Sequence, residues 1–563
     1  LAAYNFTHPK SDLLRSISHE GDPRWLTALA MRLRKGDAVS IGVLGASVAQ
    51  NGGCLTQPGK RCMAYRGARA LSMMYGGRRP HKGFAVRLFE LINATWPHRE
   101  HTLVNAALDG TPAQVMLPCL FTHLPKAVQL VIVEFGSLAL HLDHPSVEEV
   151  VRRLLSLQPP PAIVFLTVRG LCKRTPVRTN ATIRYALHSH WELYTPSERT
   201  PWAVAEEEFQ HVCVRYNVGC LSLYNAIINH MLAREPGYAL SDVSLDCLHP
   251  FNGKRGTDML TDLLVHWLHR GLLALQPRFL EDRNSASESF PLQPSLPTSV
   301  HTQGPTISST CLSFAEQGRL TSPISQAMRN VEWRTAFCAP EGRNCSQLVA
   351  VNVGCPLEAS RTRHRWAQEH KDAWLASNDK TSLLHVTQST TQSLDHRHAY
   401  HSRRGTSPRA WGYCHFAQTP PGRLKRGLAR GLTEKAKVSP GLAAIVPGAV
   451  LEVSVDTRVT PDGQADRKAR IAVGLEHLTS YENMGKVVIS CSGHCSCEPH
   501  SVDAHRTSMV RNESVFARHY FDVLGAHVQC LLRIVVHNST SSGGFKFKVR
   551  SLTLAPATSP RKY

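Results

Sequence analysis

The sequence predicts an α/β domain, with a parallel sheet between two layers of helices, followed by an all-β domain of sandwich type. Three observations carry this prediction. Strand-like apolar runs alternate with helical stretches over residues 36–275, an order typical of parallel sheets with helices on both faces. Residues 276–310 are rich in Ser, Pro and Thr without apolar periodicity, which is typical of a linker. From residue 437 onward, short runs alternate apolar and polar residues, as half-buried strands do.

The elements of the first domain follow from their own patterns. The run from Gln129 to Phe135 is almost continuously apolar, as expected for a strand buried on both faces. Helices are expected where apolar residues recur at helical spacing. The other expected strands are 38–45, 101–107, 162–168 and 219–223, and the expected helices are 84–93, 146–157, 203–216 and 257–275.

The remaining segments divide by composition. Residues 1–35 are interpreted as an N-terminal extension, and residues 311–355, with four cysteines, as the start of the second domain. Residues 356–436 are basic and rich in histidine. The irregular spacing of these histidines favours a solvated, disordered insertion over a metal site. The β domain is expected over residues 437–556, with strands at 449–455, 468–473, 485–491, 528–536 and 545–554.

The charge balance narrows the class of partner. Among 563 residues, 64 are Lys or Arg and 43 are Asp or Glu, which gives a formal net charge of +21. Such an excess favours nucleic acid, an acidic glycan or an anionic surface. Because no helix-turn-helix, zinc-finger or RNA-recognition signature accompanies it, we expect an acidic glycan and no nucleic acid. No stretch approaches 18 uncharged apolar residues, so we expect no transmembrane segment.

Cysteines and glycosylation signals indicate the compartment. The chain has 16 cysteines, and six Asn-x-Ser/Thr sequons occur at Asn5, Asn93, Asn180, Asn344, Asn512 and Asn538. Together they favour an oxidising, secretory or extracellular setting over a cytosolic protein with scattered thiols and chance sequons. No signal peptide is visible, and this prediction does not depend on one.

A serine follows the first predicted strand, in Gly45-Ala46-Ser47. In open α/β sheets, reactive groups collect at the carboxyl ends of the strands. Ser47 is therefore a candidate nucleophile, provided that a base lies nearby. A role as a helix N-cap is the alternative. The turn is a poor match to a dinucleotide-binding fingerprint, because it lacks the full G-x-G-x-x-G pattern.

The candidate base lies far along the chain, in Asp246-Cys-Leu-His249-Pro250. This loop comes after the last predicted strand and before the closing helix. A carboxylate three residues from an imidazole can fix its tautomer and stabilise the imidazolium that forms when serine is deprotonated. Taken alone, His249 fits a surface loop residue equally well.

Taken together, these blocks resemble the SGNH (GDSL-type) hydrolases. Gly45-Ala46-Ser47 stands for the family's G-D-S, and Asp246-x-x-His249-Pro250 matches its D-x-x-H-P block. The stretch from Asn105 to Gly110 stands for the second block, whose glycine lends a backbone N–H to the oxyanion hole. The resemblance implies a three-layer, flavodoxin-like fold and acyl transfer: His249, oriented by Asp246, takes the proton of Ser47, which attacks an ester carbonyl.

The first domain also looks like a branch of this family found in plants and green algae, which carries a C-terminal β domain. Two stretches of the second domain look similar to that branch, namely 440–448 and 480–485. The resemblance covers residues 36–275 well and 437–556 moderately. It does not cover 356–436.

Two positions depart from the family pattern. Ala46 replaces the aspartate of G-D-S, which is not a triad member. Leu138 stands where the third block places its oxyanion asparagine, and loss of one such donor costs about 10²–10³ in kcat. The donors implied by the resemblance are then the N–H groups of Ser47 and Gly110, with Ser137 as a partial substitute whose direction the sequence does not give.

Three functions remain open from the sequence. The first is a serine esterase that acts on O-acyl esters of extracellular or cell-wall polysaccharide. The second, motivated by Leu138, is a catalytically impaired glycan-binding or matrix protein on the same scaffold. The third is a carbohydrate O-acyltransferase, in which a sugar hydroxyl replaces water. No cofactor and no metal are expected.

The remaining cysteines and aromatic residues allow two interpretations each. The cluster of Cys491, Cys495 and Cys497, with histidines beside it, matches no standard zinc spacing, so disulfides that reach Cys530 are favoured over a metal site. Cys247 either pairs and holds the His249 loop or is a buried thiol. In the first domain, a Cys54–Cys62 pair would staple a loop beside the site. Three aromatic residues of the β domain are either sugar-stacking or structural, namely Tyr481, Tyr520 and Phe521.

Overall fold

The structure is a computed structural model, and the chain divides into two compact units. One unit comprises residues 1–306 and 317–320, and the other comprises 307–316 and 321–563. The structure describes residues 4–50, 55–57, 60–61, 83–141, 143–173, 192–244, 247–251, 253–281, 296–299, 310–313, 332–337, 349–350, 412–417, 437–459, 464–506 and 514–557.

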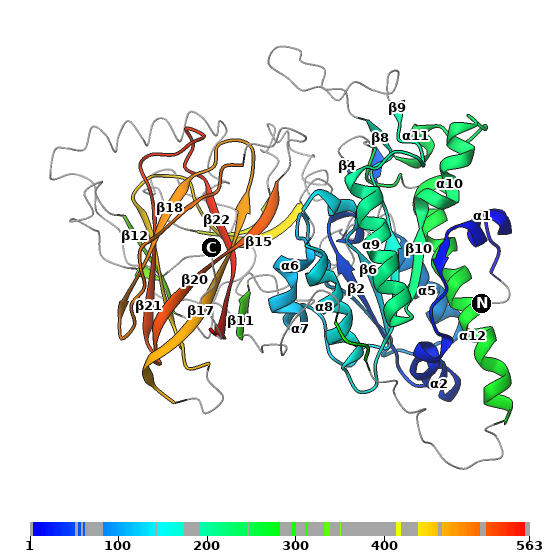
Figure 1. Cartoon of the computed structure of the whole chain (residues 1–563), viewed down its shortest axis with the longest axis horizontal. Coiled ribbons are helices and arrows are strands. Elements are labelled where there is room, and N and C mark those ends of the chain that lie inside the picture. Colours follow the sequence, from blue (N-terminus) through cyan, green and yellow to red (C-terminus); the bar gives the residue numbers. More distant parts are fainter. Residues whose placement is uncertain are drawn as a thin grey trace, which may run out of the picture. The chain divides into compact units, whose positions relative to one another are not determined.

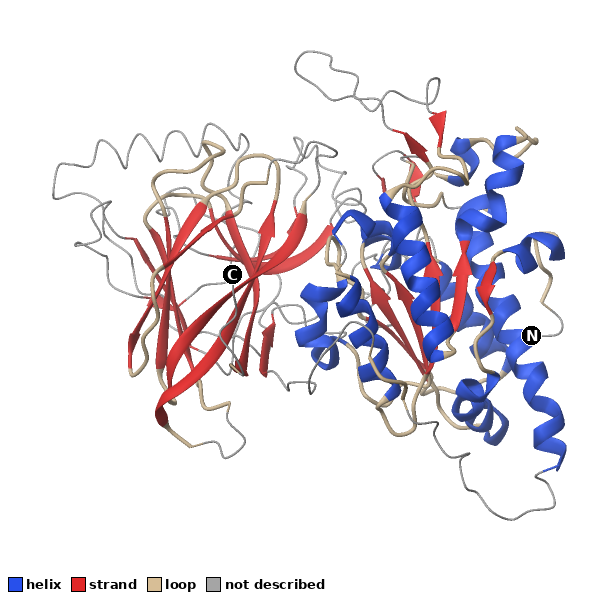
Figure 2. Ribbon diagram, viewed as in Figure 1, coloured by secondary structure: helices blue, strands red, loops and turns tan. Residues whose placement is uncertain are grey.

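The first unit is built on a mixed sheet, six-stranded in its described part, in the order β1-β10-β7-β6-β2-β5 (Figure 1, Figure 2). Its strands are β1 (Ile17–His19), β2 (Ser40–Gly45), β5 (Thr102–Asn105), β6 (Leu130–Glu134), β7 (Ala162–Thr167) and β10 (Gly219–Ser222). Five are parallel and, counted along the chain, have the doubly wound order 2-1-3-4-5. The sixth, β1, is antiparallel to β10, so the sheet differs from the purely parallel one predicted.

Helices cover both faces of this sheet (Figure 1). Ile41, Val43 and Val164 face a core shared with α2, α5, α10 and α12. On the other face, the Phe165 ring of β7 lies 5.4 Å from the Phe209 ring of α9. The helices are α1 (Lys10–Arg15), α2 (Thr27–Lys35), α3 (Ser47–Gln50), α5 (Phe84–Thr95), α6 (Ala113–Met116), α7 (Leu120–His123), α8 (His144–Leu155), α9 (Pro201–Tyr216), α10 (Leu223–Leu232), α11 (Leu240–Val243) and α12 (Met259–Glu281).

The N-terminal segment is an integral part of this unit. It supplies β1 to the sheet and the buried Leu29 and Leu33 to the core. Asp262 of α12 accepts hydrogen bonds from the Tyr4 hydroxyl at 2.6 Å and the Thr7 backbone N–H at 2.9 Å. It also lies 2.7 Å from His8 Nδ1. The described part of residues 1–35 is therefore packed against the α/β domain.

The predicted linker is also partly anchored. Helix α12 runs to Glu281, beyond the predicted end at Leu275. Within residues 296–299, the Pro297 carbonyl accepts from Arg152 of α8 at 2.6 Å, and the Thr298 carbonyl accepts from Arg215 Nε of α9 at 2.9 Å. These residues thus lie against the helical face formed by α8 and α9.

The second unit consists of two antiparallel sheets among its described residues (Figure 2). One has the order β14-β15-β22-β17-β20, with β11 also paired to β22, and the other has the order β13-β12-β16-β21-β18-β19. Their strands are β11 (Thr310–Ser313), β12 (Glu332–Phe337), β13 (Val349–Ala350), β14 (Gly412–Ala417), β15 (Lys437–Ala444), β16 (Ala449–Val455), β17 (Asp466–Thr479), β18 (Lys486–Gly493), β19 (His500–Asp503), β20 (Val515–Ala526), β21 (Cys530–Val536) and β22 (Phe547–Pro556).

The two sheets share one hydrophobic core, as in a sandwich. Val473 and Val549 of the first sheet belong to the same buried cluster as Val453 and Ile534 of the second. Burial alternates along β21 and over residues 451–455 of β16, as the sequence pattern predicts. Residues Gly412–Ala417, which fall in the predicted insertion, form strand β14 and pair with β15. The rest of the insertion lies outside the described residues.

Two small antiparallel pairs of strands lie apart from the larger sheets. The pairs are β3 (Leu55–Gln57) with β4 (Lys60–Arg61), and β8 (Cys172–Lys173) with β9 (Glu192–Leu193). In the part of the chain that the structure describes, no helix combines the length and the apolar character needed to span a bilayer.

Candidate active site

Ser47 lies at the carboxyl end of β2, as the first residue of the short helix α3. The turn before it requires glycine: Gly45 has φ +146°, and a Cβ there would lie 2.0 Å from the Glu134 carbonyl oxygen. That oxygen accepts a hydrogen bond from the Ala46 N–H at 3.2 Å. The strand-to-helix turn is therefore fixed against the neighbouring strand β6, and Ser47 is 7% exposed.

His249 lies in the loop between α11 and the π-helical turn Lys254–Asp258. The Ser244 hydroxyl donates to the His249 carbonyl at 2.8 Å, and the Phe251 N–H donates to the Val243 carbonyl at 2.7 Å. These bonds close the loop on itself. His249 as a whole is 7% exposed, so its position is set by protein contacts rather than by solvent.

The two side chains meet although they are 202 residues apart: Ser47 Oγ and His249 Nε2 are 2.8 Å apart. This is the distance expected between a nucleophile and its general base. In the tautomer with the proton on Nδ1, Nε2 accepts the hydrogen bond from Ser47. Asp246, the predicted third member, lies outside the described residues.

The pair lies where the sheet changes winding direction. β2 and β6 are the first and third parallel strands of the 2-1-3-4-5 order, so the chain winds away from their common edge in opposite directions. Open α/β sheets bind ligands outside the carboxyl ends of the strands at this point. Ser47 follows β2 and the segment around Leu138 follows β6.

The Asn105–Gly110 block packs against the Ser47 turn. The Asn105 side chain accepts from the Ala107 N–H at 3.1 Å and donates to the Ala49 carbonyl of α3 at 2.8 Å. The Leu108 N–H donates to the Gly45 carbonyl at 2.9 Å. Gly110 has φ +62° in a turn closed by the following residue, a conformation that glycine adopts without strain. Its predicted oxyanion role stays a prediction.

In the segment that the resemblance aligns with the third block, neither Leu138 nor Ser137 has a described side-chain donor free for an oxyanion. Leu138 is 8% exposed, and its N–H donates to the Phe135 carbonyl at 3.0 Å. Ser137 points both of its donors at Glu134: its N–H lies 2.9 Å from Oε1 and its hydroxyl 3.1 Å from Oε2. The direction of Ser137, which the sequence left open, is therefore toward a buried carboxylate.

Glu134 lies beside the candidate site and was not singled out from the sequence. It is fully buried, and burial raises the pKa of Glu134 to about 7, although hydrogen bonds from Ser137 and from the Ala49 backbone act in the opposite direction. With Ala49 on α3 and Ser137 after β6, this carboxyl joins the Ser47 helix to the third block. The sequence feature that could have identified it is a glutamate within an apolar run, because that run predicts a strand buried on both faces.

The disulfides resolve the alternatives for several cysteines. Cys491 pairs with Cys497, and Cys495 with Cys530, so the prediction of disulfides in that cluster is confirmed. Cys247 pairs with Cys172. Cys54 and Cys62 lie outside the described residues. Within the described ranges, no group of three or more His, Cys, Asp or Glu side chains is arranged to hold a metal ion.

The predicted aromatic residues of the β domain have different environments. Phe521 is 1% exposed and belongs to the core between the two sheets, which makes it structural. Tyr481 is 37% exposed, and Tyr520 is only partly buried.

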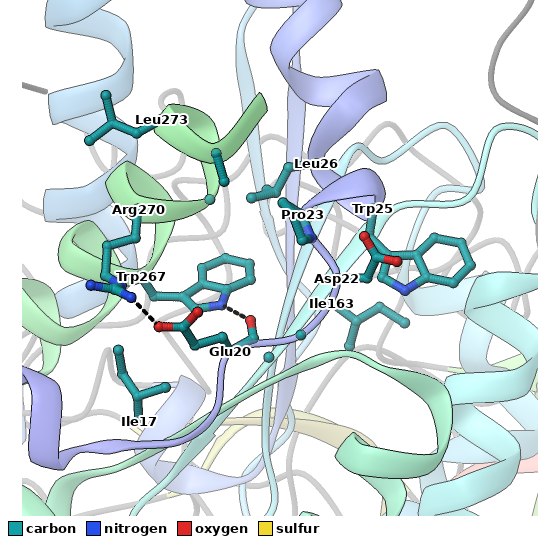
Figure 3. A pocket seen from close by; sticks show the side chains of 14 residues that line it. Ile17, Glu20, Asp22, Pro23, Trp25, Leu26, Ile163, Trp267, Arg270 and Leu273 are labelled. Carbon is teal, nitrogen blue, oxygen red and sulfur yellow. Dashed lines mark hydrogen bonds and ion pairs between the residues drawn. The ribbon is translucent and has the colours of Figure 1, made fainter. Parts of the chain in front are cut away.

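A separate hollow lies at the opposite edge of the first sheet (Figure 3). It has a volume of about 270 Å³ and is lined by Ile163, near the start of β7, and Gly219, at the start of β10. The Trp267 indole donates to the Glu20 carbonyl at 2.8 Å, and Arg270 pairs with the Glu20 carboxylate. Because the parallel strands run away from this edge, the hollow is distinct from the Ser47–His249 pair.

Comparison with known proteins finds structural matches only. No family model matches the chain, and no curated protein matches it. A two-domain esterase (CEX) active on acetylated mannans, co-crystallised with mannopentaose, matches with a TM-score of 0.45 and 12% identity over 99% of this chain and 100% of that chain. Phospholipase A1 from Streptomyces albidoflavus matches with a TM-score of 0.24 and 12% identity over 40% of this chain and 99% of that one.

A family two carbohydrate esterase from Cellvibrio japonicus matches with a TM-score of 0.12 and 14% identity, over 21% of this chain and 27% of that one. All three TM-scores lie below 0.5.

Proposed function

We propose that the protein is a serine esterase of SGNH type, and that Ser47 and His249 carry its chemistry. The observation that supports this most directly is the buried 2.8 Å contact between Ser47 Oγ and His249 Nε2. It occurs at the carboxyl edge of a doubly wound sheet, in a chain whose motif order resembles that family. A chance serine–histidine contact has no reason to coincide with both.

The proposed reaction begins with proton transfer from Ser47 Oγ to His249 Nε2 as Oγ attacks the ester carbonyl carbon. The carbonyl oxygen becomes an oxyanion, for which the backbone N–H groups of Ser47 and Gly110 are the proposed donors. His249 then gives the proton to the leaving alcohol, and an acyl-enzyme remains. Water, deprotonated by the same imidazole, releases the acid. Asp246 is the proposed orienting carboxylate.

Leu138 sets an expectation for the rate. An apolar side chain cannot donate to the oxyanion, and loss of one donor costs about 10²–10³ in kcat. The proposal is therefore a slow esterase. The same residue favours a second candidate, a catalytically impaired glycan-binding or matrix protein. A carbohydrate O-acyltransferase uses the same groups, with a sugar hydroxyl in place of water, and the products distinguish it.

The proposed substrates are O-acyl esters of extracellular or cell-wall polysaccharide. A net charge of +21 fits an acidic glycan by long-range attraction. The four described disulfide bridges, together with the six sequons, fit a protein of the secretory pathway.

The test compares the full chain with its Ser47→Ala variant on p-nitrophenyl acetate, followed by acetylated polysaccharides. If the Ser47–His249 pair is the catalytic one, kcat falls by as much as about 10⁶-fold in the variant. Ser16→Ala is the matched control, because Ser16 is also buried and its hydroxyl donates to the Leu13 carbonyl, away from the Ser47–His249 pair. Equal background rates for wild type and Ser47→Ala would exclude the esterase and leave the glycan-binding candidate.

A further inference from the structure

The His249 loop is covalently tied to the segment that follows β7. Cys247, two residues before His249, forms a disulfide with Cys172, and their Cα atoms are 5.7 Å apart. Both cysteines are fully buried. In the sequence, Cys247 stands between Asp246 and His249, so the bridge is attached within the block that carries the proposed base.

Hydrogen bonds fix the segment that carries Cys172. Leu171 donates its N–H to the Cys247 carbonyl at 2.8 Å, and its own carbonyl accepts from the Tyr194 N–H at 2.9 Å. Cys172 begins the small strand β8, which pairs with β9. The Tyr224 hydroxyl of α10 donates to the Tyr194 carbonyl at 2.8 Å. The anchor for the disulfide is therefore itself joined to β7, β9 and α10.

The conformation of the loop depends on such support. Cys247 has φ +65°, a left-handed conformation that non-glycine residues hold only where their surroundings impose it. On the other side of His249, the chain is closed by the bridge pairing of Ser244 with Pro250. His249 thus lies between one non-covalent closure and one covalent anchor.

We propose that the Cys172–Cys247 disulfide is a positioning brace that holds His249 Nε2 at hydrogen-bonding distance from Ser47 Oγ. This proposal rests on the proposed function and names two positioning residues for it. The brace links the base to β7, two strands away from β2, which positions the nucleophile. Without it, the described contacts that hold the loop are all non-covalent, such as the hydrogen bond from the Leu171 N–H to the Cys247 carbonyl. A misplacement of 1 Å costs about 10²-fold in rate.

The experiment compares two disulfide-free variants of the full chain. Cys172→Ala/Cys247→Ala removes the brace. Cys213→Ala/Cys220→Ala is the matched control, because that disulfide is also buried, lies in the same unit and joins the end of α9 to the start of β10, at the edge of the sheet away from Ser47. Hydrolysis of p-nitrophenyl acetate gives kcat and KM, and hydrogen exchange of the intact proteins reports on residues 244–251.

The expected result is specific to the brace. Its removal lowers kcat by about 10²-fold with little change in KM, and speeds amide exchange in residues 244–251. The control variant keeps the wild-type kcat and the wild-type exchange of that loop. A brace variant with wild-type kcat and exchange would overturn the proposal, as would an equal loss of kcat in both variants.

Two further measurements cover the cases in which the brace variant does not fold or the wild type is inactive. If the brace variant does not fold, wild-type protein is partly reduced and alkylated, and residual activity is compared with the alkylated fractions of Cys247 and Cys220. Residual activity that falls with alkylation of Cys220 rather than of Cys247 overturns the proposal.

If wild type and Ser47→Ala are equally inactive, the proposed function fails. Loop exchange then decides alone: faster exchange in the brace variant supports the brace, and unchanged exchange overturns it.

Discussion

Two glutamates, one in each unit, are almost completely buried yet have opposite environments. Glu134 of β6 is surrounded by neutral donors from Ser137 and Ala49, and burial raises its pKa to about 7. Glu476 of β17 meets two guanidinium groups: Arg550 Nε lies 2.7 Å from Oε1, and an Arg518 terminal nitrogen lies 3.3 Å from Oε2.

The comparison shows what decides the charge of a buried carboxyl. Burial by itself would raise the pKa of Glu476, but the charges of Arg550 and Arg518 outweigh it, so its pKa lies below the usual value. At Glu134, neutral hydrogen bonds do not outweigh burial. Formal charges within contact distance can therefore stabilise the ionised form of a buried carboxyl. Neutral N–H and O–H groups offset its desolvation only in part.

The largest expected effect is that of Glu476→Gln. The change leaves Arg518 and Arg550, both buried, without their countercharge. Removal of one partner from a buried ion pair costs about 3–5 kcal/mol, so we expect the second unit to lose that much stability. Hydrogen exchange of the amides in β17 and β22 measures it in the intact chain.

Glu482→Gln is the control for this change, because Glu482 is an exposed glutamate of the same unit. It should change stability by no more than about 0.5 kcal/mol. Similar losses in the two variants would mean that the Arg–Glu–Arg cluster is not held by charge.

The second effect is a pH dependence of opposite sign at the two glutamates. Between pH 4.5, the usual pKa of this group, and about 7, folded Glu134 binds more protons than the unfolded chain does. Its contribution to stability therefore falls as the pH rises through this window. At about 1.4 kcal/mol per pKa unit, the loss is roughly 3–4 kcal/mol at most. Glu476 contributes stability above its unfolded pKa, and this is lost as the pH falls through its lower folded pKa.

Glu134→Gln measures this directly. The unfolding free energies of wild type and variant are measured by urea denaturation at pH 5 and pH 8. Relative to wild type, we expect the variant to be more stable at pH 8 than at pH 5. A difference that is independent of pH would show that Glu134 titrates normally in the folded protein.

The smallest expected effect is that of Ser137→Ala. The variant loses the hydroxyl bond to Glu134 Oε2 and keeps the backbone bond to Oε1, so we expect a stability loss of about 1 kcal/mol. Because the hydroxyl is directed at the carboxylate, kcat for p-nitrophenyl acetate should change little. A loss of about 10²–10³-fold would instead identify Ser137 as an oxyanion donor.

The sequence alone determined the local elements and the order of the reactive groups. Apolar periodicity depends on neighbours within a few residues, so it predicted the strand at Leu130–Glu134 and the alternating burial of residues 451–455 in β16. Motif order placed Ser47 and His249 at opposite ends of one domain, and their proximity followed from the winding of a parallel sheet. The cysteine cluster after Cys491 was also predicted to form disulfides, two of which the structure contains.

The tertiary structure decided what depends on pairs far apart in the chain. Only the structure shows that Cys172 pairs with Cys247, that β1 lies antiparallel at the edge of the sheet, and that Ser137 contacts Glu134. It also buried β22 on both faces, although alternation was expected there, because the Glu476 cluster lies on its polar face. Such contacts leave no periodic signal in the sequence, since each depends on how two distant segments pack.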